Sequence, residues 1–138
     1  MKANKKILLE INKLCVSTSE KSENKNLLKS ISFNIKKNEI VGLIGESGSG
    51  KSLTSLCILG LLEKKNFNIS GEIYFNQRNI INLQENEIMK IRGSEISMIF
   101  QEPMTALNPT MKIGEQLFEV FRFHENIDNK ESLENYNR

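Results

Sequence analysis

The chain has 138 residues, of which 38% are hydrophobic and 26% charged, a composition typical of one soluble globular domain. The net charge is +2 and the lysines are scattered, so nucleic-acid binding is not indicated. No apolar run of about 18 residues and no signal-peptide core are present, and we expect a cytoplasmic protein. Cys15, Cys57 and the single His124 have neither zinc-site nor disulfide spacing, and Cys57 is expected in the core.

The first third of the sequence shows the alternation of short strands. Residues 7–16 alternate loosely and predict an edge or hairpin strand, and the polar residues 17–26 predict a loop. Strict alternation over residues 31–36 predicts a half-buried strand, followed by a tight turn at Lys37 and Asn38. An antiparallel region is therefore expected at the start of the chain.

An apolar run at residues 40–44 leads into a glycine-rich segment. The run predicts a strand buried on both faces of a parallel sheet. Residues 52–62 predict a helix that is buried over much of its surface. Strand, glycine loop and helix in this order direct the positive end of the helix dipole at a bound anion.

The glycine-rich segment fits the pattern G-x-x-x-x-G-K-[ST] without a mismatch. Its backbone N–H groups, from about Gly48 to Leu53, are expected to converge on phosphate oxygens. Lys51 is expected to reach the β- and γ-phosphates, and the Ser52 hydroxyl to bind Mg²⁺. The alternative is a glycine-rich turn that binds nothing. The candidate site consists of Gly45, Glu46, Ser47, Gly48, Ser49, Gly50, Lys51, Ser52 and Leu53.

The middle of the chain predicts a second antiparallel segment and a short helix. Residues 63–70 are polar, and residues 71–76 alternate as in a strand, with a turn at residues 76–79. Residues 85–92 predict a helix because acids begin it, basic residues end it and Gly93 follows.

The last third predicts one more strand, a linker and a helix. The strand at residues 94–101 ends at Gln101, which we expect to face the same cleft as Lys51, because ligands bind beyond the carboxyl ends of such strands. Residues 104–111 predict a turn-rich linker, and helical spacing of apolar residues begins at Ile113.

Three segments together resemble the nucleotide-binding subunits of ABC transporters: EIVGLIGESGSGKS, SGEIYF and KIRGSEISMIFQEPMTALNPTMKIGEQ. The stretch MIFQEPMTALNP, with KIRG before it, is similar to the oligopeptide, dipeptide and nickel import branch. The resemblance covers residues 8–124. It implies an α/β fold with a P-loop NTPase core, in which helices flank a parallel sheet, and an antiparallel β-subdomain. Residues 1–125 would be a partial ATP-binding domain, and residues 126–138 a polar tail at the start of an incomplete helical subdomain.

The resemblance also implies cofactors and partners. Residues 45–52 correspond to the Walker A loop for ATP, and Gln101 to the Q-loop glutamine, which in the family contacts Mg²⁺ and the attacking water. Gln101 alternatively only caps a turn at the end of a strand. The partners implied are transmembrane permease subunits and a second ATPase subunit, in a homo- or heterodimer on the inner face of the cell membrane. Met104, Leu107 and Met111 either contribute to docking a permease helix or pack against their own domain.

Two positions depart from the family pattern. Residues 16–19 carry no aromatic ring to stack on adenine, which predicts weaker nucleotide binding. The hairpin at Asn76 and Gln77 lacks the usual glycine, and a positive φ at Gln77 would cost about 1 kcal/mol of stability.

Residues 102–138 contain nothing similar to the family's signature motif, its acidic strand with the catalytic glutamate or its switch histidine. The first hypothesis is therefore a fragment of an importer ATPase that binds Mg-ATP without hydrolysing it. The second is a nucleotide-binding or interaction module that competes for the partner of another ATPase subunit, and a gene remnant stays open beside both. A P-loop kinase or GTPase is disfavoured because no acceptor or guanine site is present. We also expect poor solubility, because the 40–44 strand would expose a flank.

Overall fold

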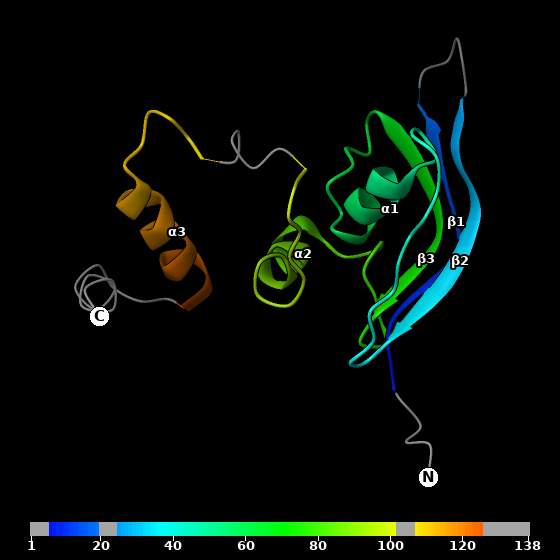
Figure 1. The fold of residues 1–138 in the computed structure, drawn as a ribbon, viewed down its shortest axis with the longest axis horizontal. Helices are drawn as coiled ribbons and strands as arrows, with labels where there is room; N and C mark the ends of the chain where they lie inside the picture. Colours follow the sequence, from blue (N-terminus) through cyan, green and yellow to red (C-terminus); the bar gives the residue numbers. More distant parts are fainter. Residues whose placement is uncertain (1–5, 20–24, 102–106, 126–138) are drawn as a thin grey trace. The chain divides into compact units, whose positions relative to one another are not determined.

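A computed structural model describes residues 6–19, 25–101 and 107–125 (Figure 1). The chain divides into two units, Met1–Ile88 and Met89–Arg138. The polar tail expected at residues 126–138 lies outside the described residues, as does Met104 of the expected docking segment.

The alternating segments of the first unit form one antiparallel sheet. Its strands are β1 (Ile7–Thr18), β2 (Asn26–Lys36), β3 (Phe67–Phe75) and β4 (Arg78–Asn79), in the order β2-β1-β3-β4. The expected antiparallel region is confirmed. Of the two alternatives predicted for residues 7–16, the hairpin strand is confirmed by the pairing of β1 with β2. The edge strand was wrong, because β1 also pairs with β3.

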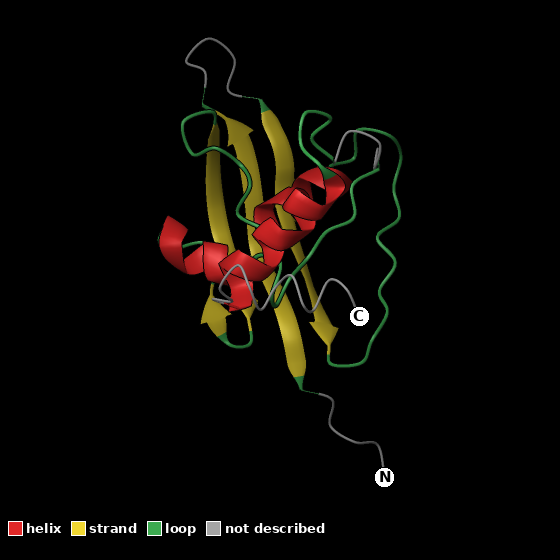
Figure 2. Ribbon diagram, turned by 90° about the vertical axis from the view of Figure 1, so that its left-hand side faces the viewer, coloured by secondary structure: helices red, strands yellow, loops and turns green. Residues whose placement is uncertain are grey.

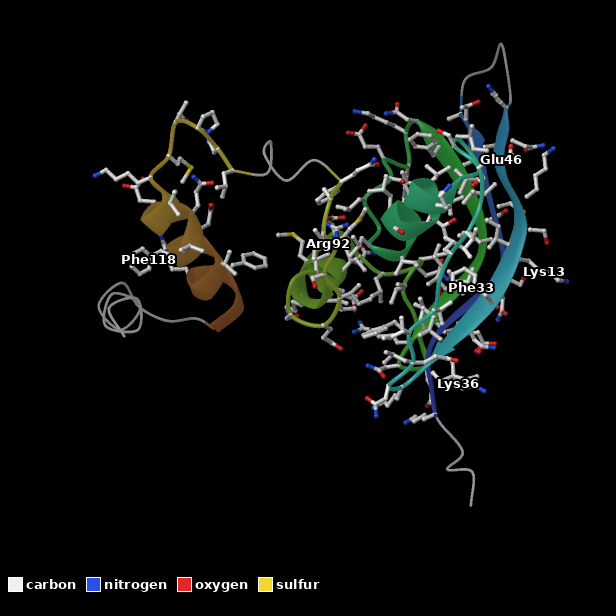
Figure 3. All side chains as sticks on the ribbon, viewed as in Figure 1. Lys13, Phe33, Lys36, Glu46, Arg92 and Phe118 are labelled. Carbon is white, nitrogen blue, oxygen red and sulfur yellow. The ribbon has the colours of Figure 1, made fainter. Side chains whose placement is uncertain are left out.

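A shift of phase in β1 keeps its apolar side chains on one face. Simple alternation would place Leu9 and Ile11 on one face, and Leu14 and Val16 on the other. The structure buries all four, because the pairing register shifts between Ile11 and Leu14, where Lys13 has a φ of 48°. The irregularity acts as a β-bulge, and Lys13 lies on the side of the sheet away from the first helix (Figure 3).

Side-chain atoms on β1 and β2 accept hydrogen bonds from backbone N–H groups around this bulge. The Lys13 N–H donates to Ser32 Oγ at 2.8 Å. Ser30 has a φ of 51° in β2, and its N–H donates to Cys15 Sγ at 3.2 Å. The departures from the ladder are therefore compensated locally.

One helix of the first unit, α1 (Lys51–Ile58), lies along one face of the sheet (Figure 2). It buries Thr54 and Cys57, and burial raises the pKa of the Cys57 thiol to about 11, which fits its expected place in the core. The core of this unit consists of Leu9, Ile11, Leu14, Val16, Leu28, Cys57, Leu59, Ile73, Phe75, Ile80 and Ile88.

α1 ends earlier than residue 62, the end that the apolar pattern predicts. Gly60 has a φ of 62°, its N–H donates to Cys57 O at 3.0 Å, and the Leu61 N–H donates to Leu56 O at 2.9 Å. These two bonds form a Schellman motif, in which a left-handed glycine ends the helix.

Residues 40–44 do not form the buried parallel strand that their composition predicts. They have no regular secondary structure, Ile40 is fully exposed, and Ile44 is 96% exposed. A strand buried on both faces needs pairing partners and cover. No strand in the part of the chain that the structure describes pairs with this segment, and the sheet found there is antiparallel.

The β3–β4 turn occupies the first half of the predicted turn at residues 76–79, and the second half forms β4. β3 begins at Phe67, within the segment expected to be a polar connection. Asn76 and Gln77 have φ values of 48° and 68°. Positive φ at both central residues is the type I′ geometry, whose twist matches that of the strands. Gln77 therefore has the positive φ that is costly where the usual hairpin glycine is missing.

The helix α2 (Glu85–Ile91) agrees closely with the predicted helix at residues 85–92. Glu87 Oε2 accepts the Gln84 N–H at 3.1 Å, which caps the first turn, and Glu87 Oε1 pairs with Arg78 Nη2 at 2.5 Å. Gly93, with a φ of 81°, ends the helix as predicted.

In the second unit, the strand predicted at residues 94–101 is absent. Residues 93–95 form a turn, residues 97–100 are irregular, and Ile99 is 93% exposed. The Gly93 N–H donates to Ile96 O at 2.9 Å, a local bond that replaces strand pairing. The alternation of apolar residues was therefore a misleading signal, since no described strand pairs with this segment.

The predicted helix that begins at Ile113 is confirmed as α3 (Ile113–Glu125). Before it, Asn108 Oδ1 accepts the Thr110 N–H at 3.0 Å in a local turn. Gln116 of the helix donates to Asn108 O and Met111 O, both at 3.0 Å. This side chain holds the preceding turn against the helix.

We predict that Gly71→Ala strongly destabilises the first unit. Gly71 has a φ of 98°, and an added Cβ would lie 2.5 Å from Lys13 O and 2.7 Å from Asn12 O. These are backbone atoms that cannot rotate away, and we expect a loss of about 2–4 kcal/mol in the free energy of unfolding, measured in urea. Gly42→Ala is the matched control, because its Cβ would meet nothing within 4 Å. Equal losses in the two variants would contradict the explanation.

We predict that Gln77→Gly stabilises the hairpin. The φ of 68° at Gln77 is unfavourable for a residue with a Cβ, and glycine removes the strain. The free energy of unfolding should rise by about 1 kcal/mol. Gln77→Ala removes the side chain but keeps the Cβ, so a comparable gain in that variant would show that strain is not the cause.

Candidate phosphate-binding site

The glycine-rich segment forms a turn that leads directly into α1. The Ser49 N–H donates to Glu46 O at 3.2 Å, and Gly48 and Gly50 have φ values of 78° and 91°. Glu46 lies on this loop (Figure 3). The tight wrapping with positive φ that the sequence predicts is therefore present, at two glycines of the loop.

Contact with β2 fixes the second half of the loop. Leu28 is buried, and its Cδ2 lies 2.2 Å from the place that a Cβ on Gly50 would occupy. Only a residue without a side chain allows this approach. Gly50 therefore serves both the φ of the turn and the packing of the loop on the sheet.

The Lys51 ammonium lies among acceptors of its own loop. Its Nζ donates to Gly45 O and Glu46 O, both at 2.7 Å, and to Ser49 Oγ at 3.2 Å. The charge is thus held inside the turn of the loop rather than extended into solvent. The sequence pattern assigned Ser49 to the site through its backbone, and no sequence signal indicated the hydroxyl contact.

The N-terminus of α1 is open to an anion. Gly50 is the N-cap residue, no side chain caps the helix, and its first turn contains no acidic residue. The Thr54 hydroxyl donates to Gly50 O at 2.9 Å, whereas Ser52 is exposed. The first N–H groups of a helix have no acceptor within it, so this end attracts negative charge.

Gln101 belongs to the second unit, where it is exposed at the end of an irregular segment. Its expected position in a cleft with Lys51 stays a prediction. Val16 is buried in the core of the sheet. It begins the segment 16–19, in which the family usually carries the aromatic residue that stacks on adenine.

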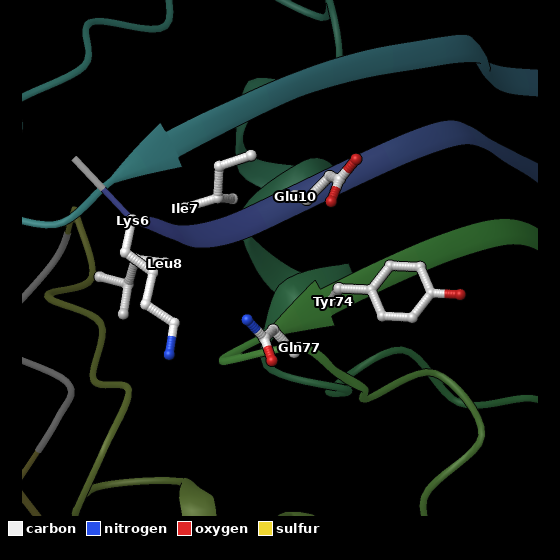
Figure 4. A pocket seen from close by; sticks show the side chains of 6 residues that line it. All are labelled: Lys6, Ile7, Leu8, Glu10, Tyr74 and Gln77. Atoms are coloured by element: carbon white, nitrogen blue, oxygen red, sulfur yellow. The ribbon is translucent and has the colours of Figure 1, made fainter. Parts of the chain in front are cut away.

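A hollow of about 410 Å³ lies beside the first half of β1 and the β3–β4 turn (Figure 4). Glu10 and Tyr74 stand side by side there, because they are register partners on β1 and β3. The hollow contains no residue of the phosphate loop. It is lined by Lys6, Ile7, Leu8, Glu10, Tyr74 and Gln77.

Within residues 6–19, 25–101 and 107–125, no group of three or more His, Cys, Asp or Glu side chains is arranged to hold a metal ion. Across the same residues, no helix combines the length and the apolar character that crossing a membrane requires.

A loop of this geometry, with a lysine at the start of an uncapped helix, is typical of the nucleotide-binding proteins that cradle phosphate groups. The family model that matches the chain is described as ABC transporter and covers residues 28–138. The chain belongs to the ABC transporter family.

Curated relatives are similar over most of the chain. AppD, an oligopeptide transport ATP-binding protein of Bacillus subtilis, is 47% identical over 126 residues, which is 91% of this chain and 38% of the relative. OppD of Escherichia coli, also an oligopeptide transport ATP-binding protein, is 44% identical over 92% of this chain and 37% of its own length. DppD of Lactococcus lactis, a dipeptide transport ATP-binding protein, is 43% identical over 85% of this chain and 34% of its own length. The chain thus spans less than two-fifths of these relatives.

We predict that Gly50→Ala destabilises the protein more than Gly48→Ala. Both glycines have positive φ, but a Cβ at Gly50 would collide with buried Leu28, whereas at Gly48 it would meet nothing within 4 Å. Backbone strain alone should cost about 1 kcal/mol, and the collision about 1–3 kcal/mol more. Urea unfolding of the two variants measures the difference, and equal losses would exclude a packing role for Gly50.

Proposed function

We propose that the chain binds Mg-ATP through residues 45–53, as part of the ATP-binding subunit of an ABC importer for peptides. The observation that carries the proposal is the Lys51 ammonium, held inside a glycine-rich turn at the uncapped start of α1. Both the fixed cation and the helix dipole favour a polyphosphate at this position.

The residues fit the phosphates of a nucleotide. The space beside Gly48 is open, so the backbone there can approach a ligand closely. In the proposal, N–H groups from Gly48 to Leu53 donate to phosphate oxygens, Lys51 donates to the β- and γ-phosphates, and Ser52 ligates Mg²⁺. A bound Mg²⁺ neutralises phosphate charge.

At the level of transport, the proposal rests on the relatives. Their names describe ATP-binding proteins for oligopeptide and dipeptide transport. We infer that the complete subunit works at the inner face of the cell membrane with permease subunits and a second ATPase subunit. Gln101 is proposed to contact Mg²⁺ and the attacking water and to relay the nucleotide state.

We infer binding without turnover for these 138 residues alone. The support is in the sequence, because residues 102–138 contain no segment similar to the signature motif or to the acidic strand of the family. Binding and hydrolysis should therefore be measured separately on this chain.

We predict that Lys51→Met lowers the affinity for Mg-ATP by a factor of about 10 to 100. A hydrogen bond to a charged group contributes about 1.5–3 kcal/mol, which corresponds to this range. Isothermal titration calorimetry of the 138-residue chain measures the dissociation constant.

Lys64→Met is the matched control, since Lys64 is an exposed lysine in the turn after α1 and the variant loses the same charge. It should bind Mg-ATP within about twofold of the native chain. Similar losses of affinity for Mg-ATP in both variants would indicate that the ligand is attracted only by the overall positive charge. A native chain that binds no Mg-ATP would refute the proposal.

A further inference from the structure

We propose that the Ser49 hydroxyl stands in for a phosphate oxygen on Lys51 when the loop is empty, and that an incoming phosphate displaces it. The inference concerns the side chain of Ser49, separate from the backbone role that the loop pattern assigns to this residue. It rests on the proposed function of the loop as a phosphate site.

The Lys51 ammonium has as many acceptors within the loop as it has donors. A lysine ammonium carries three N–H donors. Gly45 O, Glu46 O and Ser49 Oγ supply three acceptors, at 2.7, 2.7 and 3.2 Å. All three donors therefore have acceptors within the loop itself, and a phosphate oxygen gains one of them only by replacing an acceptor.

Of the three acceptors, Ser49 Oγ is the one that a phosphate can replace most easily. Gly45 O and Glu46 O are backbone atoms, and the Ser49 N–H bond to Glu46 O helps to hold the turn that presents them. Ser49 Oγ has the longest contact, and it belongs to an exposed side chain that rotates about a single bond. Its release requires neither of the two backbone carbonyl groups on Lys51 to move.

The absence of a side chain at Gly45 allows the Ser49 hydroxyl to occupy this place. Ser49 Oγ lies 2.5 Å from the position that a Cβ on Gly45 would take. Glycine at position 45 therefore leaves room for the hydroxyl to reach the ammonium. An alanine at this position would push the hydroxyl away from Lys51 without removing it.

The proposal makes an unusual prediction about affinity. Removal of the Ser49 hydroxyl should strengthen phosphate binding, because the ligand no longer competes with an internal acceptor. A net hydrogen bond of about 0.5–1.5 kcal/mol corresponds to an affinity gain of about twofold to tenfold. A hydroxyl that assisted the bound phosphate would have the opposite effect.

The first experiment measures the ammonium directly. In the 138-residue chain labelled with ¹⁵N-lysine, Lys51→Met identifies the Nζ signal of Lys51. Without a ligand, hydrogen exchange of this ammonium should be slow in the native chain and in Ser49→Thr, which keeps the hydroxyl. It should be faster in Ser49→Ala and in Gly45→Ala. Unchanged exchange in both alanine variants would overturn the proposal.

The second experiment measures affinity by calorimetry, with Mg-ATP and magnesium pyrophosphate as ligands. Ser49→Ala should bind both ligands about twofold to tenfold more tightly than the native chain, and Ser49→Thr should resemble the native chain. Equal or weaker binding by Ser49→Ala would overturn the displacement step. Urea unfolding of each variant controls for stability.

The two experiments separate this inference from the proposed function. If no form of the chain binds either ligand, the proposed function fails and so does the displacement step. The exchange rate of the Lys51 ammonium then still decides whether Ser49 holds it. If the native chain binds both ligands but exchange does not respond to Ser49, the function stands and this inference fails.

Discussion

The fold of the first unit depends on having the buried apolar side chains of β1 on one face of the sheet. Successive side chains of a strand point to opposite faces, yet the apolar residues of β1 change phase between Ile11 and Leu14. The bulge at Lys13 brings both halves onto the face that α1 covers, and Gly71 on β3 leaves room for its carbonyl groups. Without this shift, either the first or the second half of the strand would expose its apolar residues.

The phosphate loop inherits its position from that sheet. Leu28 of β2 is buried and fills the space beside Gly50 where a Cβ would otherwise lie. The loop therefore rests on the sheet at the residue that also begins α1, and Lys51 follows immediately. Gly50 thus combines the packing against the sheet with the left-handed backbone of the turn. Both features fix the start of α1, and so the position of Lys51.

Prediction from sequence succeeded where local chemistry decides the structure. Alternation located the antiparallel strands, the acids and Gly93 bounded α2, and the absence of glycine in the hairpin indicated strain at Gln77. It failed at residues 40–44, an apolar run, and at residues 94–101, an alternating segment, because neither forms a strand. A strand requires a neighbour on another part of the chain, and an apolar pattern cannot show whether that neighbour is present.

The sequence by itself determined the phosphate-loop pattern and the membership of the ABC transporter family, because these depend on residue type and spacing along a contiguous chain. Only the tertiary structure decided that β1 is a central strand, that Gly50 packs on Leu28 and that Ser49 reaches Lys51. The physical reason is distance. These features depend on positions within a few ångströms, set by backbone torsions and by packing between segments that are remote in sequence.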